Sequence, residues 1–121
     1  MTVDTSIVST MVKGDHKTYR ITVYEDDGTT PYDLTGSKLE YSVKEDGVDD
    51  TALIYKTSDI AGEIDITVPA SGVALINLIP SDTSSLTPKE YVFDIQHTSA
   101  ASKINTPIIG KLIIKQDVTN A

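Results

Sequence analysis

The chain is organised around one loop, YEDDGTTPYDLTG at residues 24–36, which is rich in Asp, Thr, Gly and Pro. These residues favour turns because they supply positive φ, a fixed φ or local side-chain hydrogen bonds. On either side of it, residues 18–24 and 38–45 alternate apolar and polar side chains. The apolar members are Tyr19, Ile21 and Val23 before the loop and Leu39, Tyr41 and Val43 after it. This period of two predicts two half-buried β-strands joined by the loop.

Further strand-like runs fill the rest of the chain, separated by Gly, Pro, Ser and Asp turns. They lie at residues 5–12, 52–56, 63–68, 73–79, 90–97 and 108–116. Only residues 80–88 suggest a helical turn, capped by Ser81 or Asp82. About eight short strands at near-regular spacing predict an all-β, antiparallel sandwich. With 121 residues, the chain is expected to form one domain over residues 1–121.

The segment Asp33-Leu34-Thr35-Gly36 is predicted to be a structural corner at the end of this sandwich. The Asp33 carboxylate is placed to accept a hydrogen bond from the backbone two residues on, and Gly36 is free to take a positive φ. Leu34, between polar neighbours, is expected to plug the end of the core. The corner would then set the register of the strand that follows.

Composition excludes several classes of partner and site. The formal net charge is −8, and the 10 Lys and Arg residues are dispersed, which argues against nucleic acid and against an anionic membrane surface. No apolar run approaches the roughly 20 residues that cross a bilayer, and no secretory signal is evident. The chain has no cysteine, which rules out disulfides and thiolate metal sites.

Several short motifs follow one another in a characteristic order. They are KGD at 13–15, YRITV at 19–23, DG at 27–28, YDLTG at 32–36, LEYSVK at 39–44, GVALINL at 72–78, DT at 82–83, YVFDIQ at 91–96, GKLII at 110–114 and QDVT at 116–119. Together they resemble the N-terminal immunoglobulin-like domain of bacteriophage upper baseplate proteins and related phage tail and virion proteins. The resemblance spans nearly the whole chain. It implies an immunoglobulin-like β-sandwich of about 7–9 strands.

Tyr91 follows the 80–88 crossover and begins a predicted strand. Its hydroxyl would tie that crossover to the strand, as a tyrosine corner does in immunoglobulin-like folds. The alternative is that Tyr91 simply packs in the core. The sequence leaves both interpretations open.

Two of the predicted strands, at residues 73–79 and 108–116, are apolar on both faces. In a lone sandwich the second face would expose Ile76, Leu78, Ile109 and Ile113 to water, and large exposed apolar patches usually mark interaction sites. Either a crossing segment, residues 1–12 or 52–56, covers these side chains, or they contact another copy or another virion protein.

The sequence offers little catalytic or metal-binding chemistry. His16 and His97 are expected to be solvated, and no nucleophile elbow or phosphate-binding glycine loop appears. The acidic loops at residues 26–28 and 46–50 lack the spacing of a calcium loop and would bind Ca²⁺ only if they met at one end. A cleft that gathered Asp26, Asp33 and Asp94 would be needed for an enzyme. We therefore predict no enzyme, no cofactor and no metal.

The resulting prediction is a structural, non-enzymatic bacteriophage virion protein of the tail, baseplate or neck. It would be assembled in the host cytoplasm and located in the virion. Its partners would be other phage virion proteins and further copies of itself in a homo-oligomer. The alternative is a surface-exposed decoration module that recognises carbohydrate or a host surface through its acidic loops.

Overall fold

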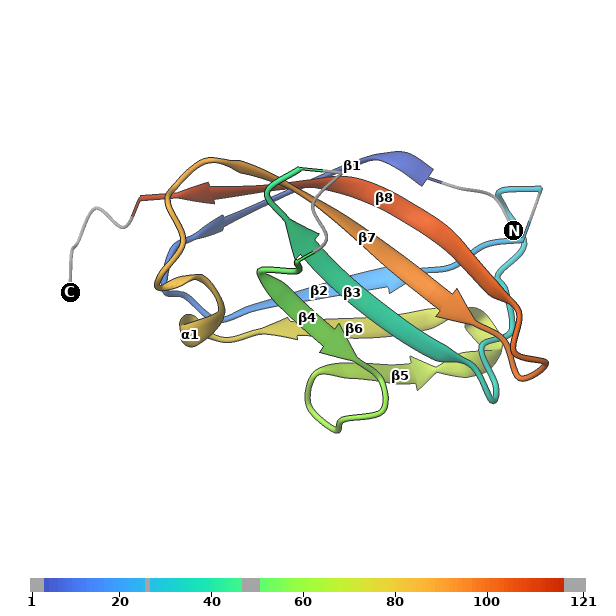
Figure 1. Ribbon diagram of the computed structural model, residues 1–121. Helices are drawn as coiled ribbons and strands as arrows, with labels where there is room; N and C mark the ends of the chain where they lie inside the picture. The colour runs from blue at the N-terminus through green and yellow to red at the C-terminus, as the bar shows by residue number, and fades with distance from the viewer. Residues whose placement is uncertain (1–3, 26, 47–50, 117–121) are drawn as a thin grey trace.

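The computed structural model describes residues 4–25, 27–46 and 51–116. Within these ranges the protein is built almost entirely from strands, which form two sheets packed face to face (Figure 1). The predicted all-β sandwich is thereby confirmed.

One sheet has five strands and the other has three. The five-stranded sheet has the order β1 (Asp4–Val12), β8 (Ile104–Lys115), β7 (Glu90–Thr98), β3 (Lys38–Lys44) and β4 (Ile54–Thr57), and the three-stranded sheet has the order β2 (Lys17–Thr22), β6 (Val73–Leu78) and β5 (Ile64–Val68). A 3₁₀ turn, η1 (Pro69–Ser71), precedes β6, and a one-turn helix, α1 (Pro80–Thr83), follows it. Two facing sheets of short strands are consistent with an all-β, immunoglobulin-like sandwich.

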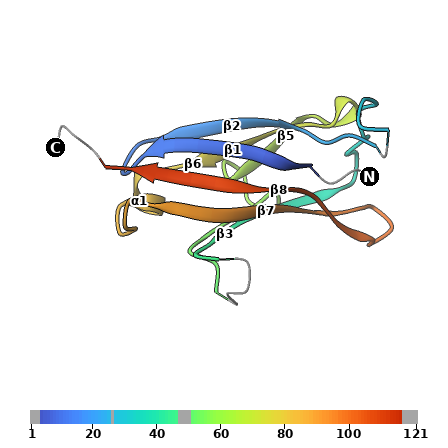
Figure 2. The same cartoon turned by 90° about the horizontal axis from the view of Figure 1, so that it is seen from above.

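The first strand departs from the expected antiparallel arrangement. β1 pairs with β8 in parallel, with Val8 opposite Lys111 and Val12 opposite Lys115, whereas the other strand pairs are antiparallel. Figure 2 shows β1 lying beside β8 along its length. Alternation along a strand reports which face is buried and carries no information on the direction of its neighbour, so the sequence could not reveal this pair.

The centre of the core is filled by aromatic and aliphatic side chains where immunoglobulin domains often place a disulfide and a tryptophan. Phe93 lies two residues after Tyr91, at the place of the second cysteine in antibody domains. The ring of Tyr41 on β3 packs against it, with ring centroids 5.3 Å apart. Packing of this kind stabilises the sandwich without a cross-link.

The prediction for β6 was wrong about which face is buried. Ile76 and Leu78 are each only 1% exposed and lie in the core, where Ile76 is opposite both Tyr19 and Ile64. The other face carries Asn77, which accepts a hydrogen bond from Thr18 and donates one to Asp65. Both faces of β6 are rich in apolar residues, so the period of two could not choose between them; the polar Asn77 marks the outward face.

The predicted corner after the opening loop is present. One Asp33 carboxylate oxygen accepts hydrogen bonds from the Thr35 amide at 2.9 Å and the Thr35 hydroxyl at 2.6 Å. Leu34 is 1% exposed, and its amide donates to the Pro69 carbonyl at 2.8 Å. Gly36 has φ of 76°. The corner thus closes one end of the core and leads directly into β3.

The opposite end of the sandwich is closed by the crossover from β6 to β7. The Tyr91 hydroxyl donates to the Thr87 carbonyl at 2.7 Å, which is the contact that defines a tyrosine corner. Asp82, in the third position of α1, accepts a hydrogen bond from the Ile79 amide at 2.8 Å, so it caps the helix from within. The same carboxylate lies 2.9 Å from the ammonium of Lys56, which joins α1 to β4.

Candidate interaction surface

The outer face of the five-stranded sheet carries exposed apolar side chains. Val8, Tyr55 and Ile109 are 58%, 48% and 43% exposed, and Val92 and Ile113 are half-buried. We call these five residues the outer sheet patch. They come from β1, β4, β7 and β8, so the sheet gathers residues that are far apart in the sequence.

Strand register places these side chains in rows. Tyr55, Ser42, Asp94 and Ile109 are successive partners across β4, β3, β7 and β8. Lys44, Val92, Lys111 and Val8 form a second row by the same rule. Paired residues of neighbouring strands point to the same side of a sheet. Apolar side chains are therefore interspersed with polar and charged ones across one continuous face.

A shallow hollow of about 270 Å³ lies in this face, lined by Ser42, Lys44, Val92, Asp94 and Ile109 together with Phe93. Partial burial raises the pKa of the Asp94 carboxyl above its ordinary value, and the nearby charge of Lys44 opposes that shift. A partly desolvated carboxylate beside apolar groups is well placed to accept a hydrogen bond or pair with a cation from a partner.

Two of the four predicted contact residues lie on this face, and two do not. Ile109 and Ile113 project from β8 within the outer sheet patch, whereas Ile76 and Leu78 are in the core. The segments expected to cover the second face do not do so, because β1 and β4 are strands of the same sheet. Val8 and Tyr55 were not among the predicted contact residues, although each stands beside an inward-facing residue in a β-branched or aromatic run.

The two histidines differ in their exposure to solvent. His16 is exposed as expected, but the prediction for His97 was wrong, because its side chain is fully buried. Its Nε2 lies 2.9 Å from the Ser37 hydroxyl, and its ring packs against that of Tyr32 in a T-shaped arrangement with ring centroids 5.0 Å apart. Burial lowers the pKa of His97. In the described ranges, His, Cys, Asp and Glu nowhere form a group of three or more that could hold a metal ion.

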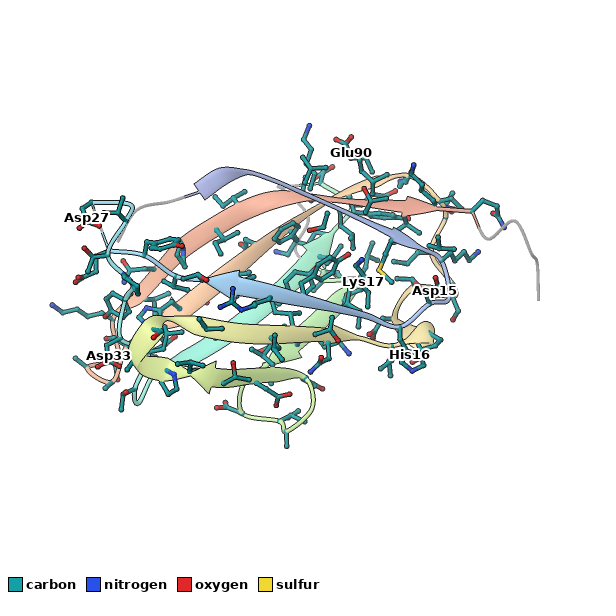
Figure 3. The ribbon with its side chains drawn as sticks, turned by 180° about the vertical axis from the view of Figure 1, so that it is seen from behind. Asp15, His16, Lys17, Asp27, Asp33 and Glu90 are labelled. Carbon is teal, nitrogen blue, oxygen red and sulfur yellow. The ribbon has the colours of Figure 1, made fainter. Side chains whose placement is uncertain are left out.

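The acidic residues of the two loops that the structure describes are Asp27 and Asp46. Asp27 and Asp33 both lie at one end of the sandwich (Figure 3), whereas Asp46 follows β3, whose seven residues span about 20 Å. Asp27 accepts hydrogen bonds from Thr30 and Thr29 in its own loop, and these lower its pKa to about 2. The hollow at Asp94 does not include Asp33. Asp26 and residues 47–50 lie outside the described residues.

Searches against protein-family models and against curated proteins found no match for this chain. The resemblance to phage baseplate domains therefore stays a prediction. Among the described residues there is no helix with the length and apolar character needed to cross a membrane.

Proposed function

We propose that this protein is a structural, non-enzymatic component of a tailed bacteriophage virion, and that it acts by packing its outer sheet patch against another copy or another virion protein. The observation that carries the proposal is the exposure of Val8, Tyr55 and Ile109 on one sheet face with no described segment over them. The immunoglobulin-like fold and the order of the sequence motifs support the virion assignment.

The chemistry of the face suits assembly. Burial of the apolar side chains away from water favours association. The charged Lys44, Asp94 and Lys111 among them restrict the orientations in which a partner can dock. Five strands about 4.8 Å apart and about 20 Å long give a face of roughly 400 Å² in projection. A standard interface buries about 800 Å² per partner, so the contact has to extend onto an adjoining edge or loop.

The first test measures the mass of the purified chain over a range of concentrations. A defined oligomer is expected, with Ile109→Asp weakening its association at least about tenfold because a carboxylate would be desolvated in the contact. Thr67→Asp is the matched control, because Thr67 is exposed on β5 of the other sheet. An oligomer that Ile109→Asp leaves unchanged would contradict this interface.

The virion assignment needs its own measurement. Mass spectrometry of purified particles of the phage that encodes the chain should detect it in a fixed ratio to the tail proteins. Its absence from intact particles would remove the structural role, whatever its oligomeric state.

A further inference from the structure

A second cavity lies between the two sheets, on the side where β1 and β2 form their edges. It has a volume of about 290 Å³ and opens between these two strands, which belong to different sheets and do not pair with each other. We propose that this cleft binds a small, uncharged, largely apolar molecule that carries one hydroxyl or carbonyl group.

The floor of the cleft is apolar and belongs to the core. Ile76, Phe93 and Ile95 line it from β6 and β7, and Ile108 lines it from β8. Ser9 on β1 and Thr22 on β2 lie in the wall. Ligand sites in proteins commonly combine such a surface with a few well-placed polar groups that fix the orientation of the ligand.

The polar groups here are two tyrosine hydroxyls. Tyr19 and Tyr41 both line the cleft, and the hydroxyl oxygen of each is buried and makes no hydrogen bond to any described residue. Tyr41 is only 2% exposed. A buried hydroxyl without a partner is unfavourable, so a ligand that supplies an acceptor or donor recovers the missing interaction.

The size of the cleft distinguishes this role from a single bridging water. A cavity needs only about 10–15 Å³ to hold one water, so the cleft is far larger than a single water requires, and its floor offers water few polar partners. Apolar groups of a ligand would fill that space more favourably.

The surroundings also favour an uncharged ligand. Among the described residues that line the cleft, Arg20 on β2 is the one charged side chain, and it is itself exposed to water. Burial raises the pKa of Tyr19 to about 12 and raises that of Tyr41 as well. The same desolvation would disfavour an ion placed beside these rings.

The test uses 4-methylphenol and toluene as a matched pair of probes, titrated into the full chain and followed by NMR. We expect saturable binding of 4-methylphenol, with shifts in the signals of Tyr19, Tyr41 and Phe93. Tyr41→Phe should weaken the binding of 4-methylphenol by about three- to tenfold, which corresponds to the loss of one hydrogen bond. The affinity for toluene, which has no hydroxyl, should not change.

A blocking variant provides the control for position. Ser9→Phe should fill the mouth of the cleft and abolish binding, whereas Thr10→Phe should not, because neighbouring residues of a strand point to opposite sides. Urea unfolding of each variant checks that it is folded. Absence of saturable binding in the unaltered chain, or binding that Ser9→Phe leaves intact, would overturn the proposal.

Discussion

Gly72 lies directly before β6, where the backbone at Val23 and Tyr32 approaches it closely. It has φ of 69°, and a Cβ at this position would lie 2.5 Å from the Val23 carbonyl oxygen and 2.8 Å from that of Tyr32. These are backbone atoms that the sheet holds in place, since the Val23 amide donates to Gly72 and the Tyr32 amide donates to Val23. A side chain at Gly72 therefore has no space that a rotamer change could provide.

We expect Gly72→Ala to lower the free energy of unfolding by about 3 kcal/mol or more, through clash and backbone strain together. Gly62→Ala is the matched control, because Gly62 has φ of 88° but nothing within 4 Å of its Cβ position. The control should cost only about 1–2 kcal/mol, from the left-handed backbone alone. Urea denaturation measures the free energy of unfolding of both variants. Equal losses of stability would show that the backbone around Gly72 moves aside to admit the new Cβ.

His97 should make stability depend on pH. Because burial lowers its folded-state pKa below the unfolded value of about 6.5, the unfolded chain binds the proton more readily. Stability is then complete above about pH 6.5 and is lost as the pH falls from there toward the folded pKa. Urea unfolding at about pH 7.5 and about pH 5.5 should show this loss. His97→Gln should make the free energy of unfolding fall less between these two pH values. His16→Gln, at an exposed site, should leave the pH dependence unchanged. If His16→Gln reduced it and His97→Gln did not, the pH dependence would not come from His97.

At the scale of elements, the contact between α1 and β4 depends on one buried ion pair. The side chains of Lys56 and Asp82 are 8% and 16% exposed. Asp82→Asn would leave the Lys56 ammonium buried without its counter-charge and should cost about 3–5 kcal/mol.

A surface pair in the same protein provides the comparison. Lys111 and Glu90 lie 3.1 Å apart but are 56% and 54% exposed. Glu90→Gln should therefore change the free energy of unfolding by no more than about 1 kcal/mol. Thermal or urea unfolding measures the loss of stability for both substitutions. Similar losses would contradict the prediction and would mean that the Lys56 ammonium reaches water once Asp82 is replaced.

The strands also show what alternation can and cannot predict. For β2, β3 and β7 it identified the buried face, because polar residues occupy nearly every second position, Val92 on β7 being the apolar exception. It failed for β6, whose two faces are both apolar apart from Asn77. For β8 it found Ile109 and Ile113 on the outward face. The cleft at Tyr19 and Tyr41 could not be predicted, since it exists because β1 pairs with β8 and leaves the edge of β2 free.

At the scale of the whole molecule, the net charge of −8 opposes association of identical copies. If the outer sheet patch joins copies through apolar contact, salt should screen this repulsion and strengthen the oligomer. Sedimentation equilibrium at about 20 mM and about 500 mM NaCl should show tighter association at the higher concentration. In the Ile109→Asp variant, salt should no longer strengthen association. If the oligomer of the unaltered chain dissociated as salt was raised, ion pairs and not apolar contacts would hold it together.

The parallel pairing of β1 and β8 has a mechanical consequence. β1 starts at one end of the sandwich and β8 finishes at the other (Figure 2). Tension applied to the two ends of the domain would pull these neighbouring strands in opposite directions along their length. The seven register pairs between them would share the load and break together, where a hairpin would unzip one pair at a time. We expect the domain to resist stretching more strongly than its equilibrium stability implies, which single-molecule force measurements would reveal.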